Sequence, residues 1–504
     1  MTLVVSDIDE TYSLIKGDSC TLKQIYDYLK VEEPGAYFNT MVQRGFKSPW
    51  HYFSKIIPEG LVVYTGHLSM LEKFGVHAKN FKTSKYNISD IKNYLTEIKR
   101  VLPFEPYDYQ KKMFAESILN QRQICLACTS SGKSVTIAMI LDFYRKHGLH
   151  GMLIVPNINL LTQFQSDIES YNLTDLLNDV EILGAGNVHT FKKSVLITTW
   201  QSMVKHTDML DKYHYILEDE VHRESSEVAG DIAKCAKNIQ IRLGFTGTIP
   251  EDPIAKMTLL GIFGQPVRYI SARELIDRGL GTPIKINSIF FEYPKEVKDL
   301  IRNTKVYSKQ LQVIKEYKPR NNFITDLAIR LQAKNENTLV LFQHTQHGKD
   351  LFMMLMRKLY PDVQVENKDI TGKKSFEFQT KYHVYFLNGE DDAKTREQTR
   401  KILEVDEKAI LVANYALMST GVNIKRLFNL IFASPLKSYT SITQSLGRGM
   451  RLFSSKKEFK VFDLIDDIGF RKHTGLFVRS YNHRKSTSYL TEDYDITEID
   501  FKLH

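Results

Sequence analysis

The sequence predicts an α/β protein in which a small α+β domain precedes two doubly wound parallel-sheet domains. Short apolar runs alternate with helical segments over residues 104–283, and the same alternation returns over residues 284–504. Residues 1–96 lack it and mix helical spacing with strand-like runs between turn residues. Short, wholly apolar strands are typical of parallel sheets that helices cover on both faces. The length of 504 residues also agrees with about three domains, at ~150 residues each.

In the first domain, Thr21–Leu29 and Leu68–Phe74 are predicted helices, and Tyr37–Val42 and Gly60–Tyr64 are predicted strands. The second domain is expected to hold strands at 123–127, 151–155, 195–199, 215–219 and 241–245. The third is expected to hold strands at 338–342, 383–387, 409–412, 428–432 and 459–464, with helices such as Phe323–Lys334 and Gly348–Leu359 between them. The polar segment 361–382 interrupts this alternation and is interpreted as an inserted loop or hairpin.

Composition and charge narrow the class of partner. Hydrophobic residues make up 42% of the chain and charged residues 25%, and the formal net charge of +9 favours a polyanion such as nucleic acid over a membrane. No apolar run approaches the ~18 residues of a membrane span, and the acidic start of the chain lacks the basic region of a signal peptide. Cys125 and Cys128 form a CxxC pair, but no second pair completes four zinc ligands, so we interpret them as small apolar residues packed behind a loop.

The segment Ala127–Ser134 has the sequence ACTSSGKS and lies between an apolar strand-like run and an apolar helical run. In that setting the backbone N–H groups of a loop wrap phosphates at a helix N-terminus, where the helix dipole favours negative charge. Lys133 can reach the β and γ phosphates of a nucleoside triphosphate, and the Ser134 hydroxyl can bind Mg²⁺. The cradle would consist of Thr129, Ser130, Ser131 and Gly132. The sequence therefore predicts a site for ATP and Mg²⁺.

Two further groups of residues suit ATP hydrolysis. Asp219, at the end of a predicted strand, can hold Mg²⁺, and Glu220 can orient and deprotonate the attacking water. An acidic strand end can also simply face solvent, but this one follows a phosphate loop in the same alternating series. Arg448 and Arg451 are three residues apart on a predicted helix and so share a face. They could neutralise charge on the γ phosphate, although paired arginines are more often a solvated surface.

In this order the motifs resemble those of the superfamily 2 helicases of the DExH type, over residues 104–465. Besides the phosphate loop, the matching segments are Tyr109-Gln110, Val155-Pro156-Asn157, Thr198-Thr199-Trp200-Gln201, Asp219-Glu220-Val221-His222, Thr246-Gly247-Thr248, Leu341-Phe342-Gln343-His344, Ser419-Thr420-Gly421-Val422-Asn423 and Gln444–Arg451. The resemblance implies two RecA-like domains and ATP hydrolysis stimulated by nucleic acid.

The resemblance also implies roles for individual residues. Those that bind the nucleotide, with adenine read by the glutamine motif, would be Tyr109, Gln110, Gly421 and Asn423. His222, Thr246, Thr248 and Gln444 would act in catalysis and in its coupling to domain movement. They would do so together with Lys133, Asp219, Glu220, Arg448 and Arg451. Those that track the nucleic-acid backbone would be Pro156, Thr199, Gln201, Thr345 and Thr420.

Three positions depart from the family pattern. Ser130 stands where the family loop usually has Gly, which narrows the backbone conformations available there. Asn157 stands where Thr is common, and Asn423 where Asp is common. None of the three removes an essential charge, so we expect an active ATPase.

The resemblance extends to the phage recombination helicases, through Tyr37-Phe38-Asn39, Pro58-Glu59-Gly60-Leu61 and Val461–Asp467. It implies that residues 1–96 form a duplex-DNA-binding domain and that the chain acts on branched DNA: Holliday junctions, stalled forks, D-loops and R-loops, the last with bound RNA. The partner would be DNA, the sequence identifies no particular recombination protein as a second partner, and a phage-encoded chain would work in the host-cell cytoplasm. The core motifs leave two alternatives open, a duplex translocase and an RNA-directed helicase. An architectural protein that has lost ATP hydrolysis is disfavoured, because the lysine, acids and arginines of the motifs are intact.

Candidate nucleic-acid contacts also lie outside the helicase core. The segment Arg44–Tyr52 interleaves basic and aromatic residues. Arg44 and Lys47 are the candidates for phosphate contacts, whereas Trp50 is better explained as a core aromatic of a small domain. In the insertion at 361–382, lysines mix with acids, which favours a solvated hairpin over a DNA-contacting pin.

Overall fold

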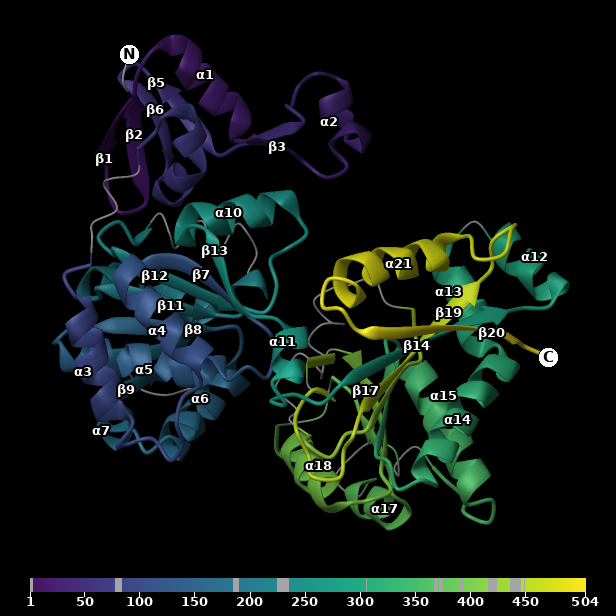
Figure 1. Cartoon of the computed structure of the whole chain (residues 1–504). Helices are drawn as coiled ribbons and strands as arrows, with labels where there is room; N and C mark the ends of the chain where they lie inside the picture. Colours follow the sequence, from purple (N-terminus) through teal and green to yellow (C-terminus); the bar gives the residue numbers. More distant parts are fainter. Residues whose placement is uncertain are drawn as a thin grey trace. The chain divides into compact units, whose positions relative to one another are not determined.

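The computed structural model describes residues 3–77, 84–184, 190–223, 235–304, 306–366, 370, 375–389, 391, 393–415, 424–435, 446–447 and 449–504. The chain forms two compact units, Met1–Ile270 and Ser271–His504. Each unit contains a seven-stranded parallel sheet with helices on its faces (Figure 1). The predicted fold class is confirmed. None of the helices in the described part of the chain is both long and apolar enough to cross a membrane.

The parallel sheet of the first unit has the strand order β13-β7-β12-β11-β8-β10-β9. Its strands are β7 (Arg122–Ala127), β8 (Gly151–Val155), β9 (Val180–Leu183), β10 (Val195–Thr199), β11 (Tyr215–Asp219), β12 (Ile241–Thr246) and β13 (Pro266–Ile270). The predicted strands are confirmed, with bounds that differ by at most one residue. β9 and β13 were not predicted, because they lie at the two edges of the sheet and are only partly buried, so they lack a continuous apolar run.

Helices cover both faces of this sheet. They are α3 (Ile88–Ile98), α4 (Asp108–Asn120), α5 (Lys133–Lys146), α6 (Ile158–Ser170), α7 (Thr174–Asn178), α8 (Trp200–Met203) and α10 (Pro253–Phe263), with 3₁₀ turns η3 (Val204–Lys212) and η4 (Val221–Arg223). α5 is buried over most of its length, from Val135 to Tyr144. A helix that is apolar on nearly all sides packs between other elements of the domain. The loop that precedes α5 therefore lies at the carboxyl end of β7.

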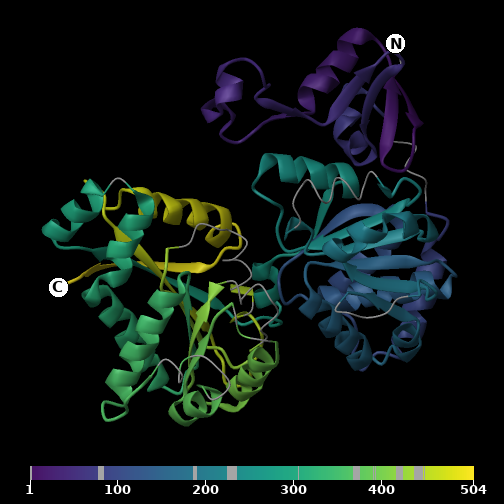
Figure 2. The ribbon, with the colours of Figure 1, turned by 180° about the vertical axis from the view of Figure 1, so that it is seen from behind.

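The N-terminal part of the first unit is a four-stranded antiparallel sheet of order β1-β2-β6-β5 (Figure 2). Its strands are β1 (Val4–Asp7), β2 (Tyr12–Lys16), β5 (Ser54–Ile57) and β6 (Gly60–Tyr64), with α1 (Ser19–Tyr28) and the 3₁₀ helix η2 (Thr65–Phe74) packed on it. A ribbon of β3 (Lys30–Glu32) and β4 (Trp50–Tyr52) carries η1 (Ala36–Phe38) and α2 (Thr40–Gln43) away from this sheet (Figures 1 and 2).

The predicted strand at Tyr37–Val42 is wrong. The segment forms the helical turns η1 and α2 instead, because the Asn39 side chain accepts a hydrogen bond from the Met41 N–H at 2.9 Å and begins α2. Its apolar residues do not face a sheet, since Phe38 is 88% exposed.

Two buried arginines join the N-terminal part to the parallel sheet. Arg122, at the start of β7, donates from Nη2 to the Glu10 carbonyl at 2.6 Å. Arg242, near the start of β12, donates from Nη2 to the Thr11 hydroxyl at 2.8 Å. The loop between β1 and β2 is therefore held against the amino ends of two central strands.

The sheet of the second unit has the order β16-β17-β15-β18-β19-β14-β20. Its strands are β14 (Ile284–Glu292), β15 (Thr338–Phe342), β16 (Val384–Leu387), β17 (Ile410–Asn414), β18 (Asn429–Phe432), β19 (Phe459–Asp467) and β20 (Asp495–Lys502). The predicted strands are confirmed, although β19 is three residues longer than expected. β14 and β20 were not predicted, because β20 is a mostly exposed edge strand and the first half of β14 alternates in burial.

The helices of the second unit are α11 (Ala272–Asp277), α12 (Lys295–Asn303), α13 (Tyr307–Glu316), α14 (Lys318–Gln332), α15 (Thr345–Leu359), α17 (Ser375–Tyr382), α18 (Ala393–Val405) and α21 (Leu476–Arg484), with a π-helical turn η5 (Lys485–Tyr489). The predicted helices at Phe323–Lys334 and Gly348–Leu359 correspond to α14 and α15. The interpretation of 361–382 as a loop or hairpin is wrong for its last part, which forms α17. The lysines at 368, 373 and 374 lie outside the described residues.

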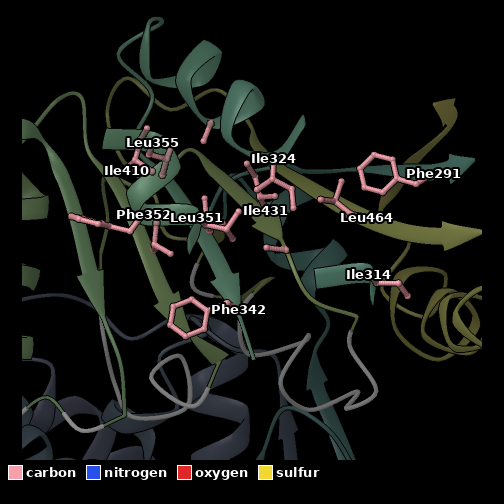
Figure 3. Packing of buried hydrophobic residues seen from close by; sticks show 14 of the residues in the cluster. Phe291, Ile314, Ile324, Phe342, Leu351, Phe352, Leu355, Ile410, Ile431 and Leu464 are labelled. Carbon is pink, nitrogen blue, oxygen red and sulfur yellow. The ribbon is translucent and has the colours of Figure 1, made fainter. Parts of the chain in front are cut away.

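The core of the second unit lies where α14 and α15 cover the sheet, with Phe342, Leu351 and Ile431 among its labelled residues (Figure 3). Next to it, Arg320 of α14 forms an ion pair with Asp466 of β19 at 2.8 Å, with both side chains fully buried. The Tyr293 hydroxyl donates to the same carboxylate at 2.7 Å. A buried ion pair needs such additional hydrogen bonds to offset the loss of water.

We expect Arg320→Met to lower the free energy of unfolding of this unit by ~3–5 kcal/mol, because it leaves the Asp466 carboxylate buried without its cation. Lys460→Met is the matched control, because Lys460 lies on β19, the strand that carries Asp466. Lys460 pairs with Glu336 at 3.2 Å, but both side chains are partly exposed, so the substitution should lower the free energy of unfolding by about 1 kcal/mol or less. Urea unfolding followed by circular dichroism measures both. Equal losses in the two variants would contradict the role given to the buried pair.

Candidate active site

The candidate active site lies at the carboxyl edge of the first sheet. β12 pairs in parallel with both β7 and β11, so the loops that follow these three strands meet at one edge. They are the phosphate loop after Ala127, the acidic segment after Asp219 and the Thr-Gly-Thr segment that begins at Thr246. The three motifs are therefore neighbours in space, although the first and the last are more than a hundred residues apart.

The phosphate loop turns sharply into α5. Gly132 precedes the helix with a φ of +75°, and a Cβ added there would lie 2.5 Å from Nε2 of Gln110. The position therefore requires glycine both for its conformation and for space. Ser130, where the family usually has Gly, also has a positive φ, of +69°. The serine thus adopts the left-handed conformation that a glycine would adopt more easily.

Lys133 begins α5, and its side chain is 9% exposed. Its Nζ donates to the Ala127 carbonyl at 3.1 Å and lies 3.5 Å from the Cys128 carbonyl. The same Nζ is 4.0 Å from Oε1 of Glu220. The ammonium is thus held within the loop by uncharged carbonyls and meets one carboxylate at the limit of an ion pair.

The carboxylate of Glu220 links this lysine to the Thr-Gly-Thr segment. Its Oε2 is 3.3 Å from Nδ1 of His222, and that Nδ1 is 2.5 Å from Oγ1 of Thr246. The Thr246 hydroxyl donates its proton to the Thr248 carbonyl at 2.8 Å, so it accepts from His222 and we assign the imidazole proton to Nδ1. Glu220 has a φ of +54°, a conformation that few residues other than glycine adopt.

The glutamine motif contacts the phosphate loop from α4. Nε2 of Gln110 donates to the Ser131 carbonyl at 2.9 Å, and its Oε1 accepts from the Tyr107 N–H at 2.9 Å. The Tyr109 hydroxyl donates to the same Ser131 carbonyl at 2.7 Å. These bonds explain why both residues are buried, and they make the motif a support of the loop. The reading of adenine by Gln110 stays a prediction.

The donors available for Mg²⁺ are few but suitable. Ser134 is half-buried in the first turn of α5, and Asp219 ends β11 with its Oδ1 accepting from the Glu220 N–H at 3.1 Å. Across the described residues, no group of three His, Cys, Asp or Glu side chains could hold a metal by itself. Mg²⁺ is commonly bound by one or two carboxylates together with substrate phosphates and water, and the chemistry of one hydroxyl and one carboxylate fits that mode.

Comparison with known proteins agrees with this geometry. Residues 103–251 match the family described as type III restriction enzyme, res subunit. Over 506 residues the chain is 27% identical to the ATP-dependent DNA helicase uvsW of Enterobacteria phage T4. The aligned region covers 96% of this chain and 94% of that protein. It is 21% identical to putative helicase 22 of a Sulfolobus islandicus filamentous virus, over 78% of this chain and 66% of that one. The chain is a homologue of ATP-dependent helicases. The resemblance to superfamily 2 helicases that the motifs suggested is confirmed.

A solved structure shares the fold of this chain. A fragment of a putative HsdR subunit of a type I restriction enzyme from Vibrio vulnificus YJ016 has a TM-score of 0.57, with 15% sequence identity over 82% of this chain and 71% of that one. At this identity the likeness shows the shared fold.

One acid of the helicase's acidic segment has a structural role that the sequence did not reveal. Glu218, which precedes Asp219, is buried, and its Oε1 accepts from Nε1 of Trp200 at 2.9 Å. The tryptophan belongs to a matched motif of its own, but nothing in the sequence connects it to Glu218. Of three successive acids, the first therefore ties two motifs together inside the sheet, and the next two reach the loop edge.

The residues expected to track nucleic acid differ in exposure. Thr199 is buried, and its hydroxyl donates to Oγ of Ser202 at 3.1 Å, at the start of α8. Gln201 is exposed and Pro156 half-buried. Asn157 begins α6 by accepting from the Leu160 N–H at 3.2 Å, which explains why Asn can replace Thr there: both residue types begin helices well.

In the second unit, Thr345 is exposed at the start of α15. The Arg451 carbonyl accepts from the Thr282 hydroxyl at 3.0 Å. The remaining predicted residues of this unit lie outside the described residues, and their roles stay predictions: they are Thr420, Gly421, Asn423, Gln444 and Arg448.

The CxxC pair of the helicase lies at the end of β7. Cys125 and Cys128 are both buried, and burial raises the pKa of the Cys125 thiol to about 12. A thiol with so high a pKa stays protonated, which agrees with the interpretation of small apolar residues behind the phosphate loop.

We expect Ser130→Val to lower the free energy of unfolding by ~1–2 kcal/mol, because a β-branched side chain is strained at a positive φ. Ser130→Gly should stay within about 1 kcal/mol of the wild type, since the relief of strain is offset by a more flexible unfolded chain. Thr129→Val is the control at the neighbouring position, which has no positive φ. Thermal and urea unfolding measure all three. Losses of equal size in the two valine variants would refute the strain at Ser130.

Proposed function

We propose that this helicase homologue hydrolyses ATP at the loop edge of its first sheet and uses the energy to move along DNA, with branched DNA as its substrate. The observation that carries the ATPase is the line of contacts from Lys133 through Glu220 and His222 to Thr246. It joins the lysine expected to bind phosphate, the acid expected to activate water and the segment expected to sense hydrolysis.

The chemistry follows from these residues. The N–H groups at the start of α5 and the Lys133 ammonium bind the phosphates, where the helix dipole adds to the attraction. Ser134 and Asp219 would hold Mg²⁺, which supplies positive charge to the phosphate oxygens. Glu220 orients a water molecule for in-line attack and accepts its proton.

The coupling of ATP hydrolysis to movement also begins at Glu220. One of its oxygens faces Lys133 and the other faces Nδ1 of His222. A proton taken up by this carboxylate removes its charge, which weakens the contact with His222. A shift of His222 would then move Thr246 through their hydrogen bond, and Thr246 would move Thr248, at the start of the next loop. The expected action of Arg448 and Arg451 on the γ phosphate is part of the same proposal and rests on the sequence.

The proposed DNA substrate has separate support. The net charge of +9 suits a polyanion, and the relative from phage T4 is named as a DNA helicase. The branched form of the substrate rests on the resemblance of the terminal segments to phage recombination helicases.

The segment around α2 suits a branch point. Phe38 is 88% exposed and Phe46 74%, and the exposed Arg44 and Lys47 belong to the same segment between β3 and β4, which carries α2 (Figure 1). Trp50 is only half-buried, and Nζ of Lys30 lies 5.2 Å from the centre of its ring. Cations would meet phosphates, while exposed rings stack on unpaired bases.

We expect Lys133→Ala and Glu220→Gln each to lower DNA-stimulated ATP turnover by at least about a hundredfold, because one removes the phosphate ligand and the other the base. DNA binding should be retained in both. Turnover is measured on a mobile four-way junction, linear duplex and single-stranded RNA, beside ATP-dependent branch migration. Near-normal turnover in both variants would refute the site. Equal stimulation of the wild type by all three nucleic acids would refute the branched substrate and leave the ATPase intact.

We expect Arg44→Ala combined with Lys47→Ala to weaken junction binding and to lower the dependence of log Kd on log salt by about one to two counterions. Lys47 must first leave Glu33, with which it pairs at 2.7 Å. Lys23→Ala, an exposed lysine of α1 in the same part of the unit, is the control. Fluorescence anisotropy over a salt series measures the slope. An unchanged slope in the double variant would exclude these residues as DNA contacts.

A further inference from the structure

A buried lysine of the second unit contacts the turn that leads to Arg451 and has no role so far. Lys456 is 7% exposed, and its Nζ donates to the carbonyls of Gly449 at 2.8 Å and Leu427 at 3.2 Å and lies 3.4 Å from that of Lys425. All three acceptors are backbone carbonyls. Such an ammonium is costly to bury, so its position requires an explanation beyond surface charge.

The three carbonyls come from two segments, one inside the Gln444–Arg451 motif and one that follows the Ser419–Asn423 motif in the sequence. Gly449 lies in the helical turn that leads to Arg451. Lys425 and Leu427 follow the Ser419–Asn423 motif directly. One ammonium therefore joins the end of the arginine-bearing turn to the segment that leaves the neighbouring motif.

Packing around the turn leaves it little freedom. A Cβ on Gly449 would lie 2.0 Å from the ring of Phe459, so the backbone there is in direct contact with the first residue of β19. Thr282 also binds the turn: its N–H donates to the Met450 carbonyl at 2.7 Å, and its hydroxyl donates to the Arg451 carbonyl at 3.0 Å. The polar contact of Lys456 completes this support.

The charge of Lys456 is sensitive to pH. Burial lowers its pKa to about 8, and the positive charge of Arg451 acts in the same direction, while Glu404 at the end of α18 opposes both. The ring of Phe459, 5.7 Å from Nζ, is uncharged. The group is therefore an ammonium at neutral pH and loses its proton in mildly alkaline solution.

We propose that Lys456 is a positioning residue of the ATPase: its ammonium holds the turn that carries Arg451 in register with the segment after Ser419–Asn423, so that ATP turnover requires this charge. The inference rests on the proposed ATPase function. It adds a residue outside the motifs, and one that acts through the backbone of the arginine turn.

The test compares the wild type with Lys456→Met, Lys456→Arg and the control Lys460→Met, by DNA-stimulated ATP turnover from about pH 7 to about pH 9.5. The kcat of the wild type should fall as the pH rises through about 8. Lys456→Met should lower kcat about tenfold with little change in KM for ATP, and its kcat should not vary with pH over this range. Lys456→Arg should extend activity to higher pH, because a guanidinium keeps its charge. Lys460→Met should follow the wild type.

The melting temperature distinguishes positioning from loss of the fold. Between the folded pKa of about 8 and the ordinary value of 10.5, the unfolded chain binds the proton more tightly than the folded one. The contribution of Lys456 to stability therefore rises with pH while the activity falls. A drop in melting temperature that parallels the loss of kcat would overturn the proposal.

Other outcomes separate the two proposals. A wild type without DNA-stimulated turnover overturns the proposed function and this inference together. An active wild type whose kcat is flat through pH 8, or a Lys456→Arg profile that matches the wild type, overturns the inference alone. The wild-type and arginine profiles decide the question even where Lys456→Met fails to fold.

Discussion

The structure of the first unit depends on one constraint, the parallel pairing of β7, β12 and β11 in the middle of a buried sheet. This pairing places Lys133 within 4.0 Å of Glu220 and, through His222, connects both to Thr246. The strands set the positions of these residues, because Thr246 ends β12, Glu220 and His222 closely follow the end of β11, and Lys133 begins the helix after β7. The site is therefore as rigid as the sheet, which is what preorganised binding of a highly charged ligand requires.

The same strands connect this site to the N-terminal part of the chain. Arg122 and Arg242 lie at the amino ends of β7 and β12 and hold the β1–β2 loop. The carboxyl ends of these two strands carry the phosphate loop and Thr246. The two strands that hold the β1–β2 loop at one end thus bear the candidate nucleotide site at the other.

The second unit buries more charged side chains than its apolar sheet suggests. Asp466 pairs with Arg320, and Asp463 on the same strand pairs with Arg484 at 2.7 Å, in side chains that are almost fully buried. The second pair holds the end of α21 on β19. Together with Lys456, these groups fix β19 and the turn before it in one arrangement, because any shift would leave a buried charge without its partner.

The sequence by itself determined the buried strands, the phosphate loop, the acidic pair and the family, because continuous apolar runs and short motifs are local signals. In the parallel sheets it missed β9, β13, β14 and β20, whose burial depends on their place at or near a sheet edge. In the N-terminal part it missed the short strands β1–β5, and it misread Tyr37–Val42, where a helix start at Asn39 overrides β propensity. Only the tertiary structure decided that Glu218 accepts a hydrogen bond from Trp200, that Gln110 packs on Gly132 and that Lys456 joins Gly449 to Leu427. Such contacts join residues distant in the chain, and no local pattern records which backbone carbonyl a buried side chain will reach.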